Sequence, residues 1–102
     1  MEIYNKKNNI LYNKKTLKYV CWLKIMEKDG TQDMTVLTAD HILGPYTMVK
    51  KGYRPYDMSS GDFDLAVDDQ SGKAYYFFEK VHSELICAEL DETYTGVGEI
   101  YS

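Results

Sequence analysis

The sequence has 102 residues, a formal net charge of −4 at pH 7 and two cysteines. This length allows one domain at most, and the negative charge argues against a nucleic-acid partner. No stretch is long and apolar enough to span a membrane, and the cysteines form neither a disulfide framework nor a metal-type spacing. We therefore expect no nucleic acid, no membrane, no metal and no other cofactor among its partners.

Both cysteines, Cys21 and Cys87, lie inside apolar, strand-like runs. A buried free thiol is the usual state at such positions, although a disulfide between the two stays open. The first residues lack the apolar core of an export signal, so none is expected in the chain as given. The cellular compartment stays open.

Strand-forming runs follow one another through the first half of the chain. The predicted strands are Ile10–Tyr12, Lys18–Met26, Asp33–Ala39 and Tyr46–Val49. The second of these is almost continuously apolar, which predicts burial on both faces. The connection Asp40–Pro45 is short, with room for one helical turn. Lys50–Gly61 is predicted to be a loop, because Gly52 and Pro55 interrupt regular structure.

The pattern then starts again. Strands are predicted at Asp64–Asp68, Lys73–Lys80, Ser83–Leu90 and Gly96–Tyr101, with a tight turn at Asp68–Gly72. Asp, Ser and Gly favour such a turn through local hydrogen bonds and tolerance of positive φ. No amphipathic helix of ten or more residues is visible, so the chain is predicted to be all-β.

The two halves resemble one another. Ile10–Asn13 and Lys18–Trp22 line up with Leu65–Asp68 and Lys73–Phe77, and Thr35–Asp40 lines up with Leu85–Leu90. Four antiparallel strands in about forty to fifty residues is the size of a β-propeller blade. We expect an irregular segment at residues 1–9 and a partial propeller at 10–102, with blade-like units at about 10–50 and 62–102. A sandwich of ordinary hairpins is the alternative.

Three residues are candidates for a site. Asp62 is an acid at a loop-to-strand junction, where catalytic carboxylates and ordinary capping acids both occur. Trp22 could stack on a sugar ring or fill the core. His82 is placed near a hairpin, where it could contact a substrate or simply lie on the surface. Asp68 and Asp69 are interpreted as turn acids.

Several motifs occur together in an order typical of one enzyme family. Ala39-Asp40 with Gly44-Pro45-Tyr46 is similar to the motif A-D-S-x-x-G-P-F. Arg54-Pro55, Ser60-Gly61-Asp62, Val67-Asp68-Asp69 and Gly72-Lys73-Ala74-Tyr75 are similar to R-P … S-R-D-M-x-L-F-x-D-D-D-G-x-A-Y. With the strand pair Ile10–Asn13 and Lys18–Trp22, they resemble glycoside hydrolase family 43. The nearest branch is the galactan 1,3-β-galactosidase-like group, of which the chain resembles an N-terminal two-blade fragment.

This resemblance implies a five-bladed propeller with an active site on its central axis. Inverting members use one carboxylic acid to protonate the leaving oxygen and a base to activate water. A third carboxylate, on the second blade, orients the acid and tunes its pKa. The resemblance assigns that third role to Asp62, because a nearby negative charge keeps a neighbouring acid protonated.

The sequence also departs from the family pattern. Lys6 falls where an acid is expected before the first strand, and Gly61 replaces the usual Arg. The catalytic acid belongs to a Glu-Ala-Pro segment on a third blade, which these residues do not include. The resemblance therefore implies part of a hydrolase of β-galactan or arabinan- or xylan-like side chains. It is expected to be inactive alone and to self-associate through unpaired blades. The alternative is a non-catalytic carbohydrate-binding or interaction module of the same fold.

Overall fold

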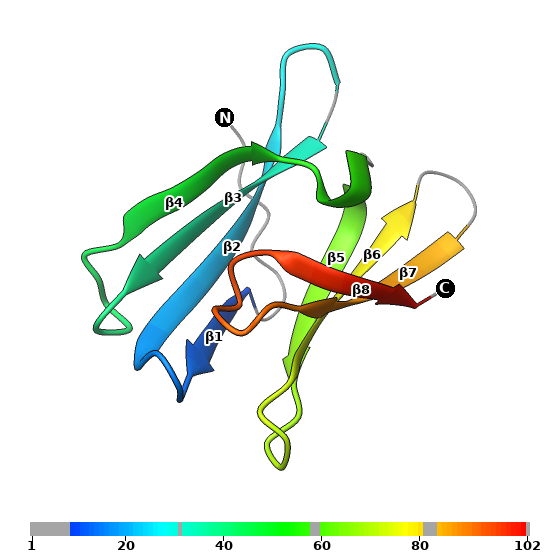
Figure 1. Cartoon of the computed structure of the whole chain (residues 1–102). Coiled ribbons are helices and arrows are strands. Elements are labelled where there is room, and N and C mark those ends of the chain that lie inside the picture. The colour runs from blue at the N-terminus through cyan, green and yellow to red at the C-terminus, as the bar shows by residue number, and fades with distance from the viewer. Residues whose placement is uncertain (1–8, 31, 58–59, 81–83, 102) are drawn as a thin grey trace.

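The computed structural model describes residues 9–30, 32–57, 60–80 and 84–101. For Asp57, residues 60–62, Lys80, Glu84 and residues 99–101, only the backbone is described. The described chain forms two four-stranded antiparallel sheets, joined by one short 3₁₀ turn, η1, at Pro55–Asp57 (Figure 1). It includes no helix that could span a membrane.

Sheet 1 is built from the first half of the chain, in the order β1-β2-β3-β4. Its strands are β1 (Ile10–Asn13), β2 (Lys18–Met26), β3 (Gln32–Ala39) and β4 (Thr47–Tyr53). Sheet 2 repeats the order with β5 (Ser60–Val67), β6 (Ala74–Lys80), β7 (Glu84–Leu90) and β8 (Val97–Tyr101). The predicted all-β fold with blade-like units is confirmed, and the long strands β2 and β6 lie inside their sheets as expected.

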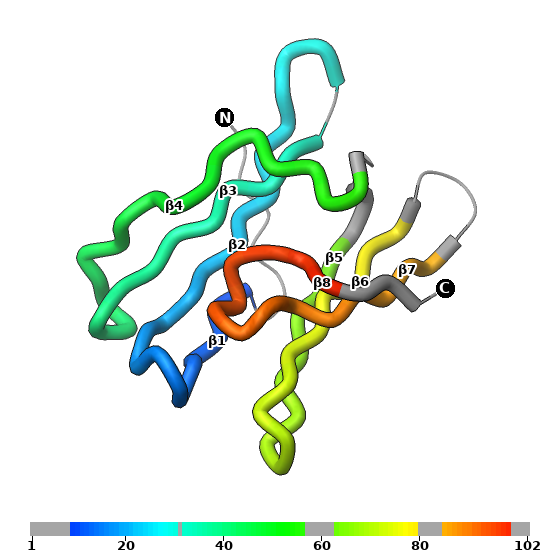
Figure 2. Tube along the Cα trace, in the orientation of Figure 1, coloured from blue at the N-terminus to red at the C-terminus, as the bar shows by residue number. Residues whose placement is uncertain are grey.

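The two sheets pack against each other through one face of each. Strand residues alternate between faces, and the buried ones on the facing sides form a single core. From sheet 1 these are Leu11, Val20, Trp22, Met34 and Val36, and from sheet 2 they include Leu65, Tyr76, Phe78, Ile86 and Leu90. Figure 2 follows the chain passing once from sheet 1 to sheet 2. The core between the sheets is therefore what holds the two halves together.

The turns that join the first two strands of each sheet are built alike. The N–H of Leu17 donates to the carbonyl of Asn13 at 2.8 Å, and the N–H of Gly72 donates to that of Asp68 at 2.7 Å. Leu17 and Gly72 both have a left-handed backbone, with φ of 59° and 77°. Lys18 therefore corresponds to Lys73 and Trp22 to Phe77, as the sequence alignment predicts.

The predicted alignment of β3 with β7 is wrong by one residue. Trp22 pairs with Val36, whereas the corresponding Phe77 pairs with Cys87. Val36 therefore corresponds to Cys87 and not to Ile86. Side chains alternate along a strand, so a slip of one residue moves each of them to the opposite face. The predicted alignment matched similar apolar residues, and apolar character alone does not show on which face of the strand a residue lies.

Several predicted boundaries also differ. β5 begins at Ser60, within the expected loop and before the expected Asp64, so Asp62 lies inside the strand and not at a loop-to-strand junction. β4 continues through Gly52 to Tyr53, where a loop was expected, because Gly52 adopts a positive φ of 64° and the pairing with β3 shifts register there. Glycine tolerates that conformation, so the strand bulges and does not end. Between Ala39 and β4 the chain bends and turns without a helical turn, the N–H of Gly44 donating to the carbonyl of His41 at 2.8 Å.

Candidate active site

Asp62 lies on β5, the edge strand of sheet 2 that contacts β1, the edge strand of sheet 1. The pairing of β5 with β6 is irregular between Ser60 and Phe63, so Asp62 falls within a β-bulge. Bulges occur often beside active sites, where they redirect side chains. The structure describes only the backbone of Asp62, and the role of its side chain stays a prediction.

The connection that leads into β5 is tied to sheet 1 by an ion pair. Arg54 Nε donates to Asp33 Oδ1 at 2.5 Å, and the Asp33 side chain is 9% exposed. The hydrogen bond and charge of Asp33 raise the pKa of Arg54 above its ordinary value. Arg54 and the buried Pro55 belong to the R-P motif, which the ion pair ties to sheet 1. The sequence analysis did not predict the role of Asp33, because no local sequence pattern indicates that it pairs with Arg54.

Two tyrosines tie the same connection to sheet 2. Tyr53 Oη accepts the N–H of Val97 at 3.0 Å, and Tyr56 Oη donates to the carbonyl of Gly98 at 2.7 Å. Burial raises the pKa of Tyr56, and its backbone is left-handed, with φ of 58°. Positive φ is costly for a bulky residue, so the surrounding contacts must hold it there. The chain from Tyr53 to Tyr56 is thus bonded to both sheets.

Asp68 is a turn acid, as predicted. Its carboxylate accepts the N–H of Gln70 at 3.1 Å and the hydroxyl of Ser71 at 3.0 Å. These bonds stabilise the ionised form and lower the pKa of Asp68. Asp69 is exposed in the same turn. Neither carboxylate is on the part of β5 that carries Asp62.

Trp22 lies in the core. Its side chain has no exposed surface, and its Nε1–H donates to the carbonyl of Tyr94 at 2.9 Å. It packs 5.0 Å from the ring of Tyr76, measured between centroids. An indole enclosed in this way offers no face to a sugar. The structure therefore supports the interpretation of Trp22 as a core residue. His82 lies outside the described residues.

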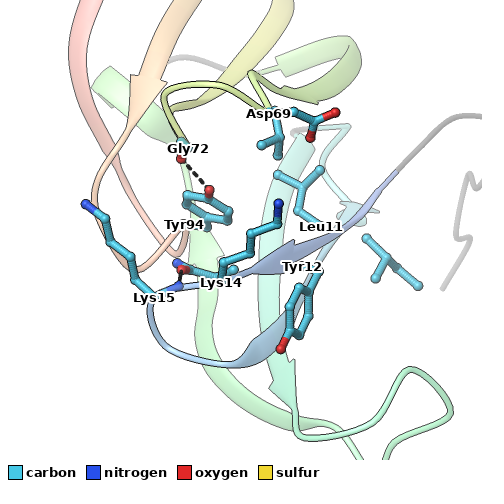
Figure 3. A pocket seen from close by; sticks show the side chains of 10 residues that line it. Leu11, Tyr12, Lys14, Lys15, Asp69, Gly72 and Tyr94 are labelled. Atoms are coloured by element: carbon cyan, nitrogen blue, oxygen red, sulfur yellow. Dashed lines mark hydrogen bonds between the residues drawn. The ribbon is translucent and has the colours of Figure 1, made fainter.

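A cavity of about 250 Å³ opens at the far end of β5 from Asp62. Its lining includes Tyr12, Lys14, Lys15, Val67, Asp69 and Gly72 (Figure 3). Tyr94 forms one wall, and its hydroxyl donates to the carbonyl of Gly72 at 2.5 Å. The lining holds one carboxylate, that of Asp69, whereas hydrolysis by the two-carboxylate scheme needs a pair. The cavity therefore does not supply that chemistry by itself.

No metal cluster is present in the part of the chain that the structure describes. Cys21 and Cys87 are free thiols, on opposite sides of the two-sheet core. Asp62, on the edge strand β5, stays the candidate that the family motif predicts.

The repeated four-strand units define a pair of β-propeller blades. No family model matches the sequence, and no curated protein sequence matches it. Solved structures do match. Over 91% of this chain, the structure is similar to an exo-β-1,3-galactanase from Phanerochaete chrysosporium in complex with β-1,3-galactotriose, at 26% identity and a TM-score of 0.81. Over 87%, it is similar to a family 43 β-1,3-galactosidase, at 29% identity and a TM-score of 0.72.

A second family 43 β-1,3-galactosidase, bound to galactodeoxynojirimycin, shares the fold at 23% identity and a TM-score of 0.70. These matches confirm the predicted resemblance to glycoside hydrolase family 43, on its β-1,3-galactan branch. The chain spans 22%, 19% and 40% of the length of these three relatives.

Proposed function

We propose that this chain is a two-blade part of a glycoside hydrolase acting on β-linked galactose polymers or related arabinan- or xylan-like side chains. The observation that carries the proposal is the match over 91% of the chain to an exo-β-1,3-galactanase in complex with β-1,3-galactotriose. The motif containing Asp62 falls at the start of β5, the edge strand of sheet 2.

In this proposal Asp62 supplies a carboxylate that holds a neighbouring general acid in its protonated, proton-donating state. A negative charge nearby disfavours ionisation of that acid, so its pKa rises toward the working pH. Arg54, Tyr53 and Tyr56 position the strand that carries Asp62 through their bonds to both sheets. The general acid is expected on a further blade, so residues 1–102 alone are expected to be inactive.

The reading frame around the coding sequence tests this directly. A continuing frame that encodes a blade with a Glu-Ala-Pro segment supports the hydrolase. Purified protein containing that blade should release galactose from β-1,3-galactotriose, and its Asp62→Asn variant should retain the fold while turnover falls by about 10².

The second candidate is a carbohydrate-binding module that has lost the chemistry. The departure from the family pattern at Lys6 raises this alternative, although the resembled branch supplies its base elsewhere. Isothermal titration of the 102-residue chain with β-1,3-galactotriose distinguishes the two when combined with the reading frame. Saturable binding without hydrolysis, in a frame that lacks the further blade, supports the module and contradicts the hydrolase.

A further inference from the structure

The cavity between the β1–β2 turn and the β5–β6 turn takes no part in the proposed hydrolysis. Its volume is about 250 Å³, and its lining joins the buried side of β1, at Leu11 and Asn13, to Val67 of β5. The cavity therefore opens between the two sheets and away from their outer faces. Val67 lies roughly 16 Å along β5 from Asp62, at the rise of an extended strand. A ligand in this cavity is thus separate from the site predicted for Asp62.

Hydrogen bonds among three turns hold the walls of this cavity. Asn13, with 1% of its surface exposed, donates from Nδ2 to the carbonyl of Glu92 at 2.7 Å. The hydroxyl of Tyr94 donates to the carbonyl of Gly72 (Figure 3). These bonds join the β1–β2 turn, the loop before β8 and the β5–β6 turn. The cavity is therefore preformed, as small-molecule sites usually are.

Two side chains of opposite charge lie at the mouth of the cavity. Lys14 extends from the β1–β2 turn toward the side on which Asp69 lies (Figure 3). The β5–β6 turn does not depend on the Asp69 carboxylate, because Asp68 accepts the bonds from Gln70 and Ser71. The Lys14 ammonium and the Asp69 carboxylate are exposed, and neither forms an ion pair with another residue that the structure describes. Both groups are therefore available to a ligand.

The lining matches a neutral sugar ring in size and polarity. Pockets for drug-sized ligands span about 300–1,000 Å³, so this smaller volume suits a single ring. Leu11, Val67 and the ring of Tyr94 supply apolar surface for the C–H face of a pyranose. Lys14 can donate to the sugar hydroxyls, and Asp69 can accept from them. A simple ion of either sign would meet a like charge as well as an opposite one.

We propose that this cavity binds one neutral hexopyranose unit, such as a β-galactose residue, at a second sugar site away from Asp62. The choice of a sugar rests on the proposed function. Two sites on one protein hold different units of one polymer chain, and binding at the first raises the local concentration of the polymer at the second. The cavity thus favours long chains over short oligosaccharides that cannot reach both sites.

Amide chemical shifts of the isotope-labelled chain, titrated with methyl β-galactopyranoside, test the proposal. Saturable shifts are expected at Leu11, Asp69 and Gly72. Asp69→Ala and Lys14→Met should each weaken binding by about tenfold, because each removes one charged hydrogen-bonding partner. Both side chains are exposed, so the variants should stay folded, and circular dichroism checks this. Lys28→Met, in the exposed turn between β2 and β3, is the charge-matched control and should bind as the unaltered chain does.

The absence of saturable shifts at the cavity overturns the proposal, and so does binding that both cavity variants leave unchanged. Shifts confined to residues 60–63 would place the sugar beside Asp62 and also contradict it. Cavity shifts with the amino acid alanine but not with the galactoside would assign the Lys14 and Asp69 pair to a zwitterion. Release of galactose by protein containing the further blade is a separate readout. Its absence contradicts the proposed function, whereas the cavity shifts decide this inference.

Discussion

The indole N–H of Trp22, in sheet 1, donates to the backbone carbonyl of Tyr94, 2.9 Å away in the loop before β8 of sheet 2. Tyr94 has a left-handed backbone, with φ of 65°, and its hydroxyl donates to the carbonyl of Gly72. One loop of sheet 2 thus satisfies the only polar atom of the largest buried side chain in sheet 1. This bond gives the apolar contact between the sheets a fixed register.

Trp22→Phe should therefore destabilise the fold by about 2 kcal/mol, from lost packing and a buried carbonyl left without its donor. Urea unfolding followed by circular dichroism measures the change. Tyr12→Phe, at a ring that is 41% exposed, is the control and should change stability by less than about 0.5 kcal/mol. Equal losses in the two variants would contradict the structural role of the indole.

The pH dependence of stability should contain a contribution from Asp68. Its pKa is lower in the folded chain because Gln70 and Ser71 donate to its ionised form. The carboxylate therefore stabilises the fold fully above its ordinary pKa near 4, and that stabilisation is lost as pH falls through the lower folded value. Melting temperatures of Asp68→Asn should approach those of the unaltered chain as pH falls from 6 to 3. Asp69→Asn is the neighbouring control, and an identical profile for both variants would contradict this prediction.

Arg54→Met should destabilise the fold more than Asp33→Asn combined with Arg54→Met. Removing the guanidinium alone leaves the nearly buried Asp33 carboxylate without its partner, whereas the double change removes the charge as well. Chemical unfolding of the two single variants and the double variant measures the coupling. Additive effects would show that the ion pair contributes nothing to the position of the segment before β5.

The two thiols should differ in their reaction with iodoacetamide. Burial raises the pKa of both, so the reactive thiolate is scarce near neutral pH and both rates should rise as pH approaches 9. Cys87 is half-buried and Cys21 is 8% exposed, so Cys87 should react first. Mass spectrometry of alkylated peptides at a dilution that favours monomers gives the order, and faster labelling of Cys21 would contradict the burial described here.

The alternation of apolar residues was sufficient to predict the strands and their division into two units, because burial of one face imposes a period of two. The alternation could not predict that β4 continues beyond Gly52. A bulge depends on the backbone conformation of one residue and on its pairing with the neighbouring strand. The register of β7 was also missed, because Leu85-Ile86-Cys87-Ala88 is apolar on both faces. That double-sided pattern is itself informative, because it marks a strand with a packing face on each side.

The site was predicted less completely than the fold. The R-P motif identified Arg54 and Pro55, but the ion pair with Asp33 joins residues far apart in sequence, and local patterns carry no information about it. Trp22 could have served either role from its sequence context, and its complete burial in the structure distinguishes them. Asp62 was predicted through the family motif alone, and its role stays a prediction that the experiment with a further blade tests.

Among the strands that the structure describes, neither sheet takes one from the other half of the chain: β1–β4 end at Tyr53 and β5–β8 begin at Ser60. A backbone cut in the connection between them would break no strand pairing. We expect two separately expressed pieces, divided after Asp57, to recombine through the Trp22 and Tyr76 contact when mixed. The same property lets a gene gain, lose or exchange a whole sheet by recombination at one short connection without disturbing any hydrogen-bonded ladder.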